Sequence, residues 1–242
     1  MTAWGRGQRL VVAAALLTGM VQVAWAHTPN DSLTRPTDLP LHEVPASQAG
    51  RWIAVFITGD GGWVDADRAL AHALASRGIA VVALDARAYL RSKKRSPGGA
   101  ADDAGRILRY YEELWNRDQV ALIGYSRGAD MMPFIANRLA ADLKGQVGLV
   151  ALLGLAPRAS FEFHWSDLIR DTRKPTDLPV EPELERLRGK RILCVYGIED
   201  RSSACREAER GLVTVVERAG SHRLGADDAP DLARTIVGAL TP

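Results

Sequence analysis

Short runs of apolar residues alternate with longer amphipathic stretches along most of the chain. The runs are apolar at nearly every position, which is typical of strands buried on both faces of a parallel sheet. They lie at residues 51–58, 79–84, 120–123, 147–155, 191–196 and 212–217. The stretches between them repeat apolar positions every three or four residues, which predicts helices. These helices are expected at residues 64–77, 100–115, 129–143 and 229–240. The alternation predicts an α/β fold, with a mostly parallel sheet and helices on both faces.

Three stretches depart from this alternation. Residues 39–44 predict a short edge strand. Residues 87–95 carry five basic side chains and predict a solvated loop at the carboxyl end of a strand. Residues 158–188 contain three prolines and an aromatic cluster, so we expect irregular structure there. The sequence shows no internal repeat and no linker, which predicts a single domain over residues 38–242.

The first 26 residues have the pattern of a cleavable export signal. Two arginines precede an apolar run of small residues over positions 10–23, and Ala24-Trp25-Ala26 forms a cleavage motif. We therefore predict a periplasmic mature protein that starts with a flexible leader over residues 27–37. The alternative is an uncleaved membrane anchor, for which the apolar run is short.

Composition and charge narrow the class of protein. A length of 242 residues with 47% apolar residues suits one domain with a well-formed core. The formal net charge is only +2, from 31 basic and 29 acidic side chains. This balance argues against nucleic acid or another polyanion as a partner.

The chain has two cysteines, and the predicted export changes their interpretation. Cys194 lies in an apolar run, and Cys205 lies just beyond the following loop. In an oxidising compartment two such cysteines are expected to form a disulfide, which here would close a small loop over residues 197–204. The alternative is a pair of buried free thiols.

A candidate nucleophile lies in Gly124-Tyr125-Ser126-Arg127-Gly128, between an expected strand and an expected helix. In that position a G-x-S-x-G sequence predicts the sharp turn that exposes the serine nucleophile of α/β-hydrolases. Such a serine needs a base to take its proton, an acid to orient the base, and donors for the oxyanion. The alternative is a small residue in a structural turn.

Two later loops supply an acid and a base. Asp200 and His222 each follow an expected strand, and the order Ser126, Asp200, His222 is the order found in α/β-hydrolases. Because the carboxyl ends of parallel strands meet at one edge of a sheet, we expect these side chains to lie close together. Glu199 remains an alternative acid, and His164 remains an alternative base.

The oxyanion would be stabilised by two backbone N–H groups. One is expected from Arg127, directly after the serine, and the other from Asp60 or Gly61 in the glycine-rich loop after the first buried strand. That loop lacks the lysine and the spacing of a phosphate-binding motif. This chemistry needs no cofactor and no metal, and none is predicted.

These motifs together resemble the bacterial virulence protein family VirJ/AcvB, within the α/β-hydrolases, in its short single-domain form. The resemblance covers nearly the whole mature chain and is most specific at residues 58–63 (TGDGGW) and 124–130 (GYSRGAD). At Arg127 the resemblance leads us to expect an aromatic residue instead. The other matching positions are Tyr89, Arg95-Ser96-Pro97, Asp102, Pro133-Phe134, Phe161-Glu162-Phe163-His164, Tyr196-Gly197-Ile198-Glu199-Asp200, Cys205 and Gly220-Ser221-His222.

The resemblance implies a periplasmic protein linked to virulence and to type IV secretion. Longer members of the family are aminoacyl-phosphatidylglycerol hydrolases, so the implied substrate is an aminoacylated phospholipid at the membrane surface, and the implied role is membrane lipid homeostasis. Ser126 would attack the lysyl ester of lysyl-phosphatidylglycerol, and water activated by His222 would then release lysine. Two other functions stay open: a general small-ester (dienelactone-type) hydrolase, and a non-catalytic periplasmic factor that assists type IV secretion.

Several side chains near the expected site are candidates for substrate binding. Arg95 and its basic neighbours would hold a lipid phosphate or face an anionic leaflet, although such a loop is as often simply solvated. Asp130, like Asp60 and Asp65, would receive the lysyl ammonium group, although each also suits a helix cap. The remaining candidates are three ring side chains: Trp63, Tyr125 and His164.

Overall fold

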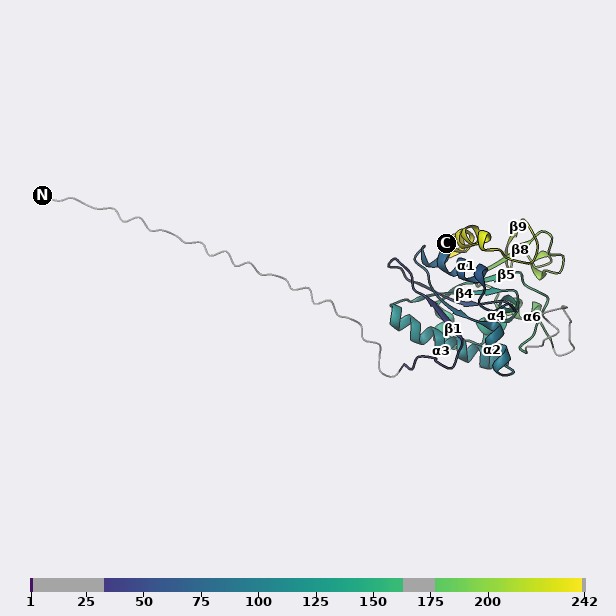
Figure 1. The fold of residues 1–242 in the computed structure, drawn as a ribbon, viewed down its shortest axis with the longest axis horizontal. Coiled ribbons are helices and arrows are strands. Elements are labelled where there is room, and N and C mark those ends of the chain that lie inside the picture. The colour runs from purple at the N-terminus through teal and green to yellow at the C-terminus, as the bar shows by residue number, and fades with distance from the viewer. Residues whose placement is uncertain (2–32, 163–176, 241–242) are drawn as a thin grey trace.

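A seven-stranded sheet forms the centre of the fold in the computed structural model, which describes residues 33–162 and 177–240 together with Met1 (Figure 1). The strand order is β1-β3-β2-β4-β5-β8-β9. Neighbouring strands are parallel, except that β1 runs antiparallel to β3 at one edge. The strands are β1 (Leu41–Val44), β2 (Trp52–Ile57), β3 (Ala80–Leu84), β4 (Gln119–Tyr125), β5 (Val147–Leu153), β8 (Ile192–Gly197) and β9 (Thr214–Arg218). The predicted mostly parallel sheet and its short edge strand are therefore confirmed.

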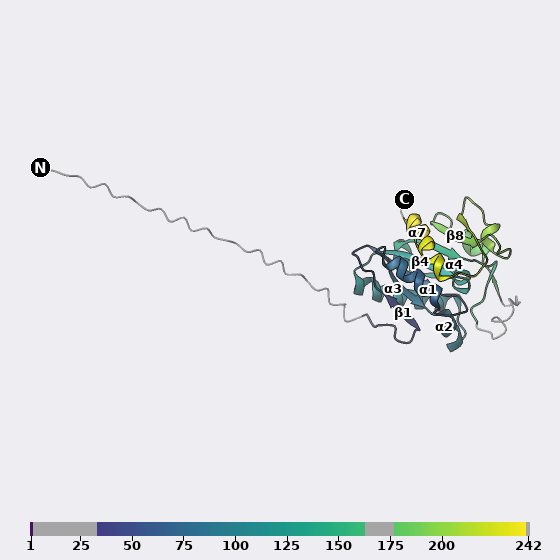
Figure 2. The ribbon, with the colours of Figure 1, turned by 45° about the horizontal axis from the view of Figure 1, so that its top comes forward.

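Helices cover both faces of this sheet (Figures 1 and 2). Successive residues of β2 point to opposite faces, so Val55 and Ile57 join one core cluster while Ala54 and Phe56 join the other. The helices α1 (Asp65–Ala75) and α7 (Ala229–Leu240) lie on one face, and α2 (Ala86–Ser92), α3 (Pro97–Trp115) and α4 (Arg127–Arg138) lie on the other. This is the three-layer arrangement that the apolar pattern predicts.

The helix α2 occupies most of the segment for which the charge run predicted a loop, so that prediction is wrong for residues 87–92. The Asp85 carboxylate accepts a hydrogen bond from the Ala88 N–H at 2.8 Å, which caps the helix. Tyr89 and Leu90 are buried in the core. A helix of seven residues makes about two turns and needs only these few apolar contacts. The basic residues around them hide the apolar spacing in the sequence.

The single helix predicted over residues 129–143 is two helices in the structure. α4 ends at Arg138, and α5 (Ala141–Gln146) begins after Leu139 and Ala140, whose ψ angles of 151° and 150° are not helical. Leu139 and Leu143 are both buried, so the apolar spacing continues across the break. The spacing of apolar residues indicates which side chains face the core. It does not reveal that two residues between the helices have extended backbone.

The segment predicted to be irregular contains short elements where it is described. β6 (Arg158–Ala159) pairs with β7 (Leu178–Pro179), and α6 (Glu181–Arg186) follows. His164 lies outside the described residues, as does the predicted export signal apart from Met1. Within the described ranges, no helix is long and apolar enough to cross a membrane.

Candidate active site

Ser126 lies in a strained turn between β4 and α4. Its φ of 52° and ψ of −118° fall in a region that residues with a side chain rarely adopt, at a cost of about 1–3 kcal/mol. The Ser126 N–H donates to the Leu153 carbonyl at 2.8 Å. A Cβ at Gly128 would lie 2.0 Å from the Ile57 carbonyl oxygen, so only glycine lets α4 approach β2 this closely. The packing of α4 on the sheet therefore holds the serine at the carboxyl edge.

The structure brings Ser126, His222 and Asp200 together from three separate loops. The His222 Nε2 atom lies 2.8 Å from the Ser126 Oγ atom, and the Nδ1 atom lies 2.7 Å from Asp200 Oδ2. Asp200 is buried, whereas its neighbour Glu199 is exposed. Of the two acids that the sequence left open, Asp200 is therefore the one that contacts the histidine.

The surroundings of Asp200 favour its charged form. Burial by itself would raise the pKa of this carboxyl, but hydrogen bonds from His222 and Ser202 outweigh it, so the pKa lies below its usual value. The Ser202 hydroxyl donates to Asp200 Oδ1 at 2.8 Å, and the Ser202 N–H does so at 3.2 Å. The sequence reading missed Ser202, although an Asp followed two residues later by Ser is the spacing of an Asx turn.

The imidazole ring of His222 is held by close packing as well as by hydrogen bonds. Gly154, with φ +69°, lies against the ring, and a Cβ at this position would be 2.9 Å from the His222 Cε1 atom. The Tyr125 ring stacks on the imidazole at a centroid distance of 6.0 Å. A larger residue at position 154 would push the imidazole away from the serine.

Two backbone segments lie next to the serine. Arg127 is the first residue of α4, where backbone N–H groups have no intrahelical acceptor. The other segment is the turn that closes where the Gly62 N–H donates to the Gly59 carbonyl at 3.0 Å. A Cβ at Gly59 would be 3.2 Å from the Ser126 Cβ, so this turn, with residues 60 and 61 at its centre, lies directly beside the nucleophile. The role of Arg127 and of Asp60 or Gly61 as oxyanion donors stays a prediction.

The side chains of Arg127 and Asp60 connect these two segments. The guanidinium donates from Nε to Asp60 Oδ1 at 2.9 Å and from one terminal nitrogen to Oδ2 at 3.1 Å. The Arg127 side chain is 11% exposed and that of Asp60 is 28% exposed. The two residues are 67 positions apart, and no local pattern in the sequence signals their pairing.

Two of the predicted substrate-binding rings have contacts within the protein. The Trp63 ring stacks on His42, with centroids 4.8 Å apart and planes inclined by 9°. The Tyr125 hydroxyl donates to the His222 carbonyl at 3.4 Å and accepts from the Leu224 N–H at 3.1 Å. These contacts connect both rings to the surroundings of the site, and their roles toward a substrate stay predictions.

The two charged side chains predicted to bind substrate, Arg95 and Asp130, also have partners within the protein. The Arg95 guanidinium lies 3.1 Å from Asp103 and 3.9 Å from the centroid of the Tyr89 ring, and its side chain is 8% exposed. Asp130 is buried and accepts a hydrogen bond from the Ala156 N–H at 2.7 Å. These partners give both side chains a structural role in the fold, and a role in substrate binding stays a prediction.

The predicted disulfide is confirmed. Cys194 on β8 and Cys205 in the short helix η2 (Ala204–Arg206) are bonded, with Cα atoms 5.6 Å apart and both residues buried. The loop that the bond closes carries Asp200. In the parts of the chain that the structure describes, no group of three or more His, Cys, Asp or Glu side chains is arranged to hold a metal ion.

The sheet order, the turn at Ser126 and the three converging loops define an α/β-hydrolase fold. Solved structures with this fold are similar over most of the chain. Est1E from Butyrivibrio proteoclasticus is 14% identical with a TM-score of 0.58, covering 84% of this chain and 93% of its own. MenH from S. aureus is 14% identical with a TM-score of 0.60, and the match covers 83% of this chain and 97% of MenH. A putative dienelactone hydrolase from Klebsiella pneumoniae is 13% identical with a TM-score of 0.57, covering 84% and 92%.

The family within this fold follows from the sequence match. Residues 51–242 match the family described as bacterial virulence protein (VirJ), and the chain belongs to that family. A comparison with curated proteins found no match. At identities this low the solved structures establish the shared fold alone.

Proposed function

We propose that this chain is an exported serine hydrolase that cleaves the aminoacyl ester of an aminoacylated phosphatidylglycerol, with lysyl-phosphatidylglycerol as the first candidate. The observation that carries the proposal is the hydrogen-bonded series from Ser126 Oγ through the His222 imidazole to Asp200, at 2.8 and 2.7 Å. This series has the geometry of a serine nucleophile, its general base and the acid that orients the base.

The first half of the reaction transfers the aminoacyl group to the protein. Ser126 Oγ attacks the ester carbonyl carbon while His222 Nε2 takes the hydroxyl proton. The N–H groups of Arg127 and of Asp60 or Gly61 stabilise the oxyanion that forms. The ester C–O bond then breaks, His222 returns the proton to the departing glycerol oxygen, and phosphatidylglycerol leaves.

The second half releases the amino acid. His222 takes a proton from a water molecule, whose oxygen attacks the acyl carbon bound to Ser126. When the tetrahedral intermediate collapses, the bond to Oγ breaks and His222 returns its proton to the serine. The ionised Asp200 stabilises the imidazolium in both halves, because it accepts a hydrogen bond from Nδ1.

Two observations support a lipid substrate. The chain belongs to the VirJ family, and its resemblance to longer members that hydrolyse aminoacyl-phosphatidylglycerol makes an aminoacylated lipid the first substrate class to test. Exposed basic residues on and after α2 (Arg91, Lys93 and Lys94, the last of which pairs with Glu162) suit the surface of an anionic membrane, where a basic residue contributes about 1 kcal/mol. The N-terminal signal pattern supports export, and the disulfide is compatible with an oxidising compartment.

The nucleophile is tested with a fluorophosphonate probe and a Ser126→Ala variant. Wild-type protein should be labelled and Ser126→Ala should not, because the probe forms a bond only to an activated serine. An Asp200→Asn variant should label slowly, whereas Glu199→Gln should label at the wild-type rate. Folded wild-type protein that is not labelled would contradict the proposal.

The substrate is tested with vesicles that contain lysyl- or alanyl-phosphatidylglycerol, and with short p-nitrophenyl esters. The comparison of the lysyl and alanyl lipids shows whether the cationic lysyl side chain is required. Asp60, one candidate partner for that charge, is already paired with Arg127. Aminoacyl lipid should be the fastest substrate. Faster turnover of the aryl esters would favour a general small-ester hydrolase. A secretion phenotype that survives Ser126→Ala would favour a non-catalytic factor.

A further inference from the structure

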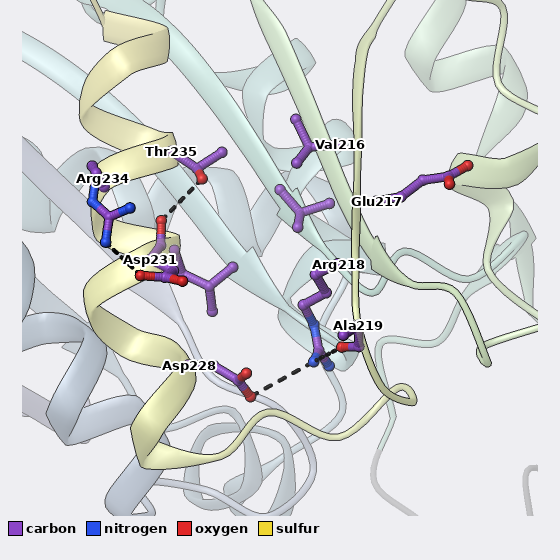
Figure 3. A pocket seen from close by; sticks show the side chains of 10 residues that line it. Val216, Glu217, Arg218, Ala219, Asp228, Asp231, Arg234 and Thr235 are labelled. Carbon is purple, nitrogen blue, oxygen red and sulfur yellow. Dashed lines mark hydrogen bonds and ion pairs between the residues drawn. The ribbon is translucent and has the colours of Figure 1, made fainter.

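The last residue of β9, Arg218, extends its side chain along the loop that carries His222 (Figure 3). Its guanidinium donates to three backbone carbonyls of that loop: Ala219 at 2.9 Å, Ser221 at 2.5 Å and Arg223 at 2.6 Å. The Asp228 carboxylate lies 3.6 Å away and balances the charge. The carbonyls on both sides of His222 therefore point at one cation.

An arginine suits this arrangement well. The three carbonyls accept from two separate nitrogens of Arg218, and the guanidinium offers five N–H groups in a rigid fork. The Arg218 side chain is 15% exposed, and its guanidinium lies between the loop and an adjoining cavity. Without the guanidinium, the carbonyls would repel one another and the loop would open to reach solvent.

Other contacts hold the same loop from its remaining sides. The Leu224 N–H donates to the Tyr125 hydroxyl at 3.1 Å, next to the nucleophile. The Glu199 N–H donates to the Gly220 carbonyl at 3.0 Å, which joins the loop of the base to the loop of the acid. These two bonds set the ends of the loop, and Arg218 sets the curvature between them.

We propose that Arg218 is a positioning residue that shapes the 219–223 loop around its guanidinium and so keeps the His222 imidazole aligned between Ser126 and Asp200. The effect of this positioning on the reaction rate rests on the proposed hydrolase function. The alignment of the imidazole ring is independent of that function, because the ring can be observed without any turnover.

The surroundings of Arg218 provide a matched control. Its guanidinium lines a cavity of about 570 Å³ between β9 and α7, and Arg234 of α7 lines the same cavity (Figure 3). Arg234 is 70% exposed and pairs with Asp231 in its own helix. Both arginines face one solvent-connected space, and of the two, Arg218 is the one with hydrogen bonds to the loop of the base.

The first experiment measures ester hydrolysis by wild-type protein, Arg218→Ala, Arg218→Lys and Arg234→Ala over a range of pH. Arg218→Ala should lower kcat by about 100-fold with little change in KM, since displacement of a catalytic group by about 1 Å has an effect of this size. Millimolar guanidinium should restore part of that kcat, because the cavity admits the ion. The kcat of Arg218→Lys should lie between those of wild type and Arg218→Ala. The kcat of Arg234→Ala should match that of wild type, with and without guanidinium.

The second experiment observes His222 itself by NMR of protein labelled with ¹⁵N-histidine. The proton on Nδ1 that is shared with Asp200 should give a strongly downfield resonance in wild type and Arg234→Ala. This resonance should be lost or broadened in Arg218→Ala. Thermal unfolding confirms that each variant is folded.

The outcomes separate the two proposals. Arg218→Ala with wild-type kcat and a wild-type Nδ1 proton resonance would overturn the positioning role. If Arg218→Ala does not fold, the same two results in Arg218→Lys would overturn it. If wild type hydrolyses no ester but only the Arg218 variants lose the resonance, the positioning role stands and the hydrolase proposal fails.

Discussion

Arg127 and Asp60 form an ion pair beside the candidate nucleophile, and each belongs to a backbone segment expected to stabilise the oxyanion. The two hydrogen bonds are parallel, at 2.9 and 3.1 Å, and the site is only partly open to water. In such surroundings a bidentate pair fixes geometry more strongly than an exposed ion pair does. We infer that the pair holds the turn at residues 59–62 against the start of α4.

A double-mutant cycle tests this ion pair. Arg127→Ala and Asp60→Ala should each lower kcat for ester hydrolysis by roughly 10- to 100-fold, and the double variant should lose little more than either single variant. The matched control is the Arg109–Asp142 pair, whose side chains are 45% and 57% exposed. Its cycle should leave kcat unchanged. Additive losses at residues 127 and 60 would show that the two side chains act separately.

Asp67 is a second residue whose surroundings have a measurable consequence. Its side chain is buried beneath the turn before α1 and accepts a hydrogen bond from the Val64 N–H at 3.2 Å. Burial raises its pKa from 3.8 to about 6; the bond from Val64 opposes this rise, and the nearby charge of Asp85 adds to it. The folded state therefore binds the proton more tightly than the unfolded state does.

The pH dependence of stability follows from that shift. The favourable contribution is fully present below pH 4 and is lost as the pH rises through 6, so above pH 6 the charged carboxyl costs up to about 3 kcal/mol. Asp67→Asn cannot titrate, and its amide oxygen can still accept the Val64 hydrogen bond. Relative to wild type, this variant should gain stability between pH 5 and pH 8 in urea unfolding. A difference that does not change with pH would contradict the assignment.

At the scale of elements, the carboxyl ends of β8 and β9 carry the acid and the base on adjacent loops. The disulfide joins the middle of β8 to η2, and the loop between them holds Asp200. The apolar side chain of Ile198, within this loop, is 53% exposed and adds little packing. The covalent bond therefore supplies order that packing alone would not.

Removal of the disulfide should destabilise the fold. In the chain-entropy account, a bond between residues 11 positions apart contributes about 3 kcal/mol. The Cys194→Ala/Cys205→Ala variant should unfold at correspondingly lower urea concentration, and a reductant should shift wild type in the same direction. The variant itself should not respond to reductant. An unchanged wild-type midpoint in reductant would show that the bond contributes no stability.

The whole molecule is a sheet between two helical layers, with the candidate site at the carboxyl edge. Export of this molecule is the proposal that belongs to this scale. Expressed with its N-terminal segment in a Gram-negative host, the protein should be recovered from the periplasm with His27 as its first residue and its disulfide formed. Mass spectrometry of the periplasmic and membrane fractions measures this. An intact N-terminus retained in the membrane fraction would indicate the uncleaved anchor instead.

The sequence alone determined the layer architecture, the strand at each apolar run and the segments that contain Ser126, Asp200 and His222. It could do so because burial on both faces leaves a continuous apolar run, and because a tight turn at a strand end needs particular small residues. Local patterns of this kind are fixed by backbone geometry and burial, which act over a few neighbouring residues.

Only the tertiary structure decided the contacts between distant segments. The choice of Asp200 over Glu199 and the Arg127–Asp60 pair both depend on which strands are neighbours in the sheet. The bonds from Arg218 to the 219–223 loop are close in sequence, and the conformation of the folded loop decides them. The break between α4 and α5 likewise depends on how each helix packs. A charged side chain takes the partner that folding brings within reach, and nothing in the residues beside it specifies that partner.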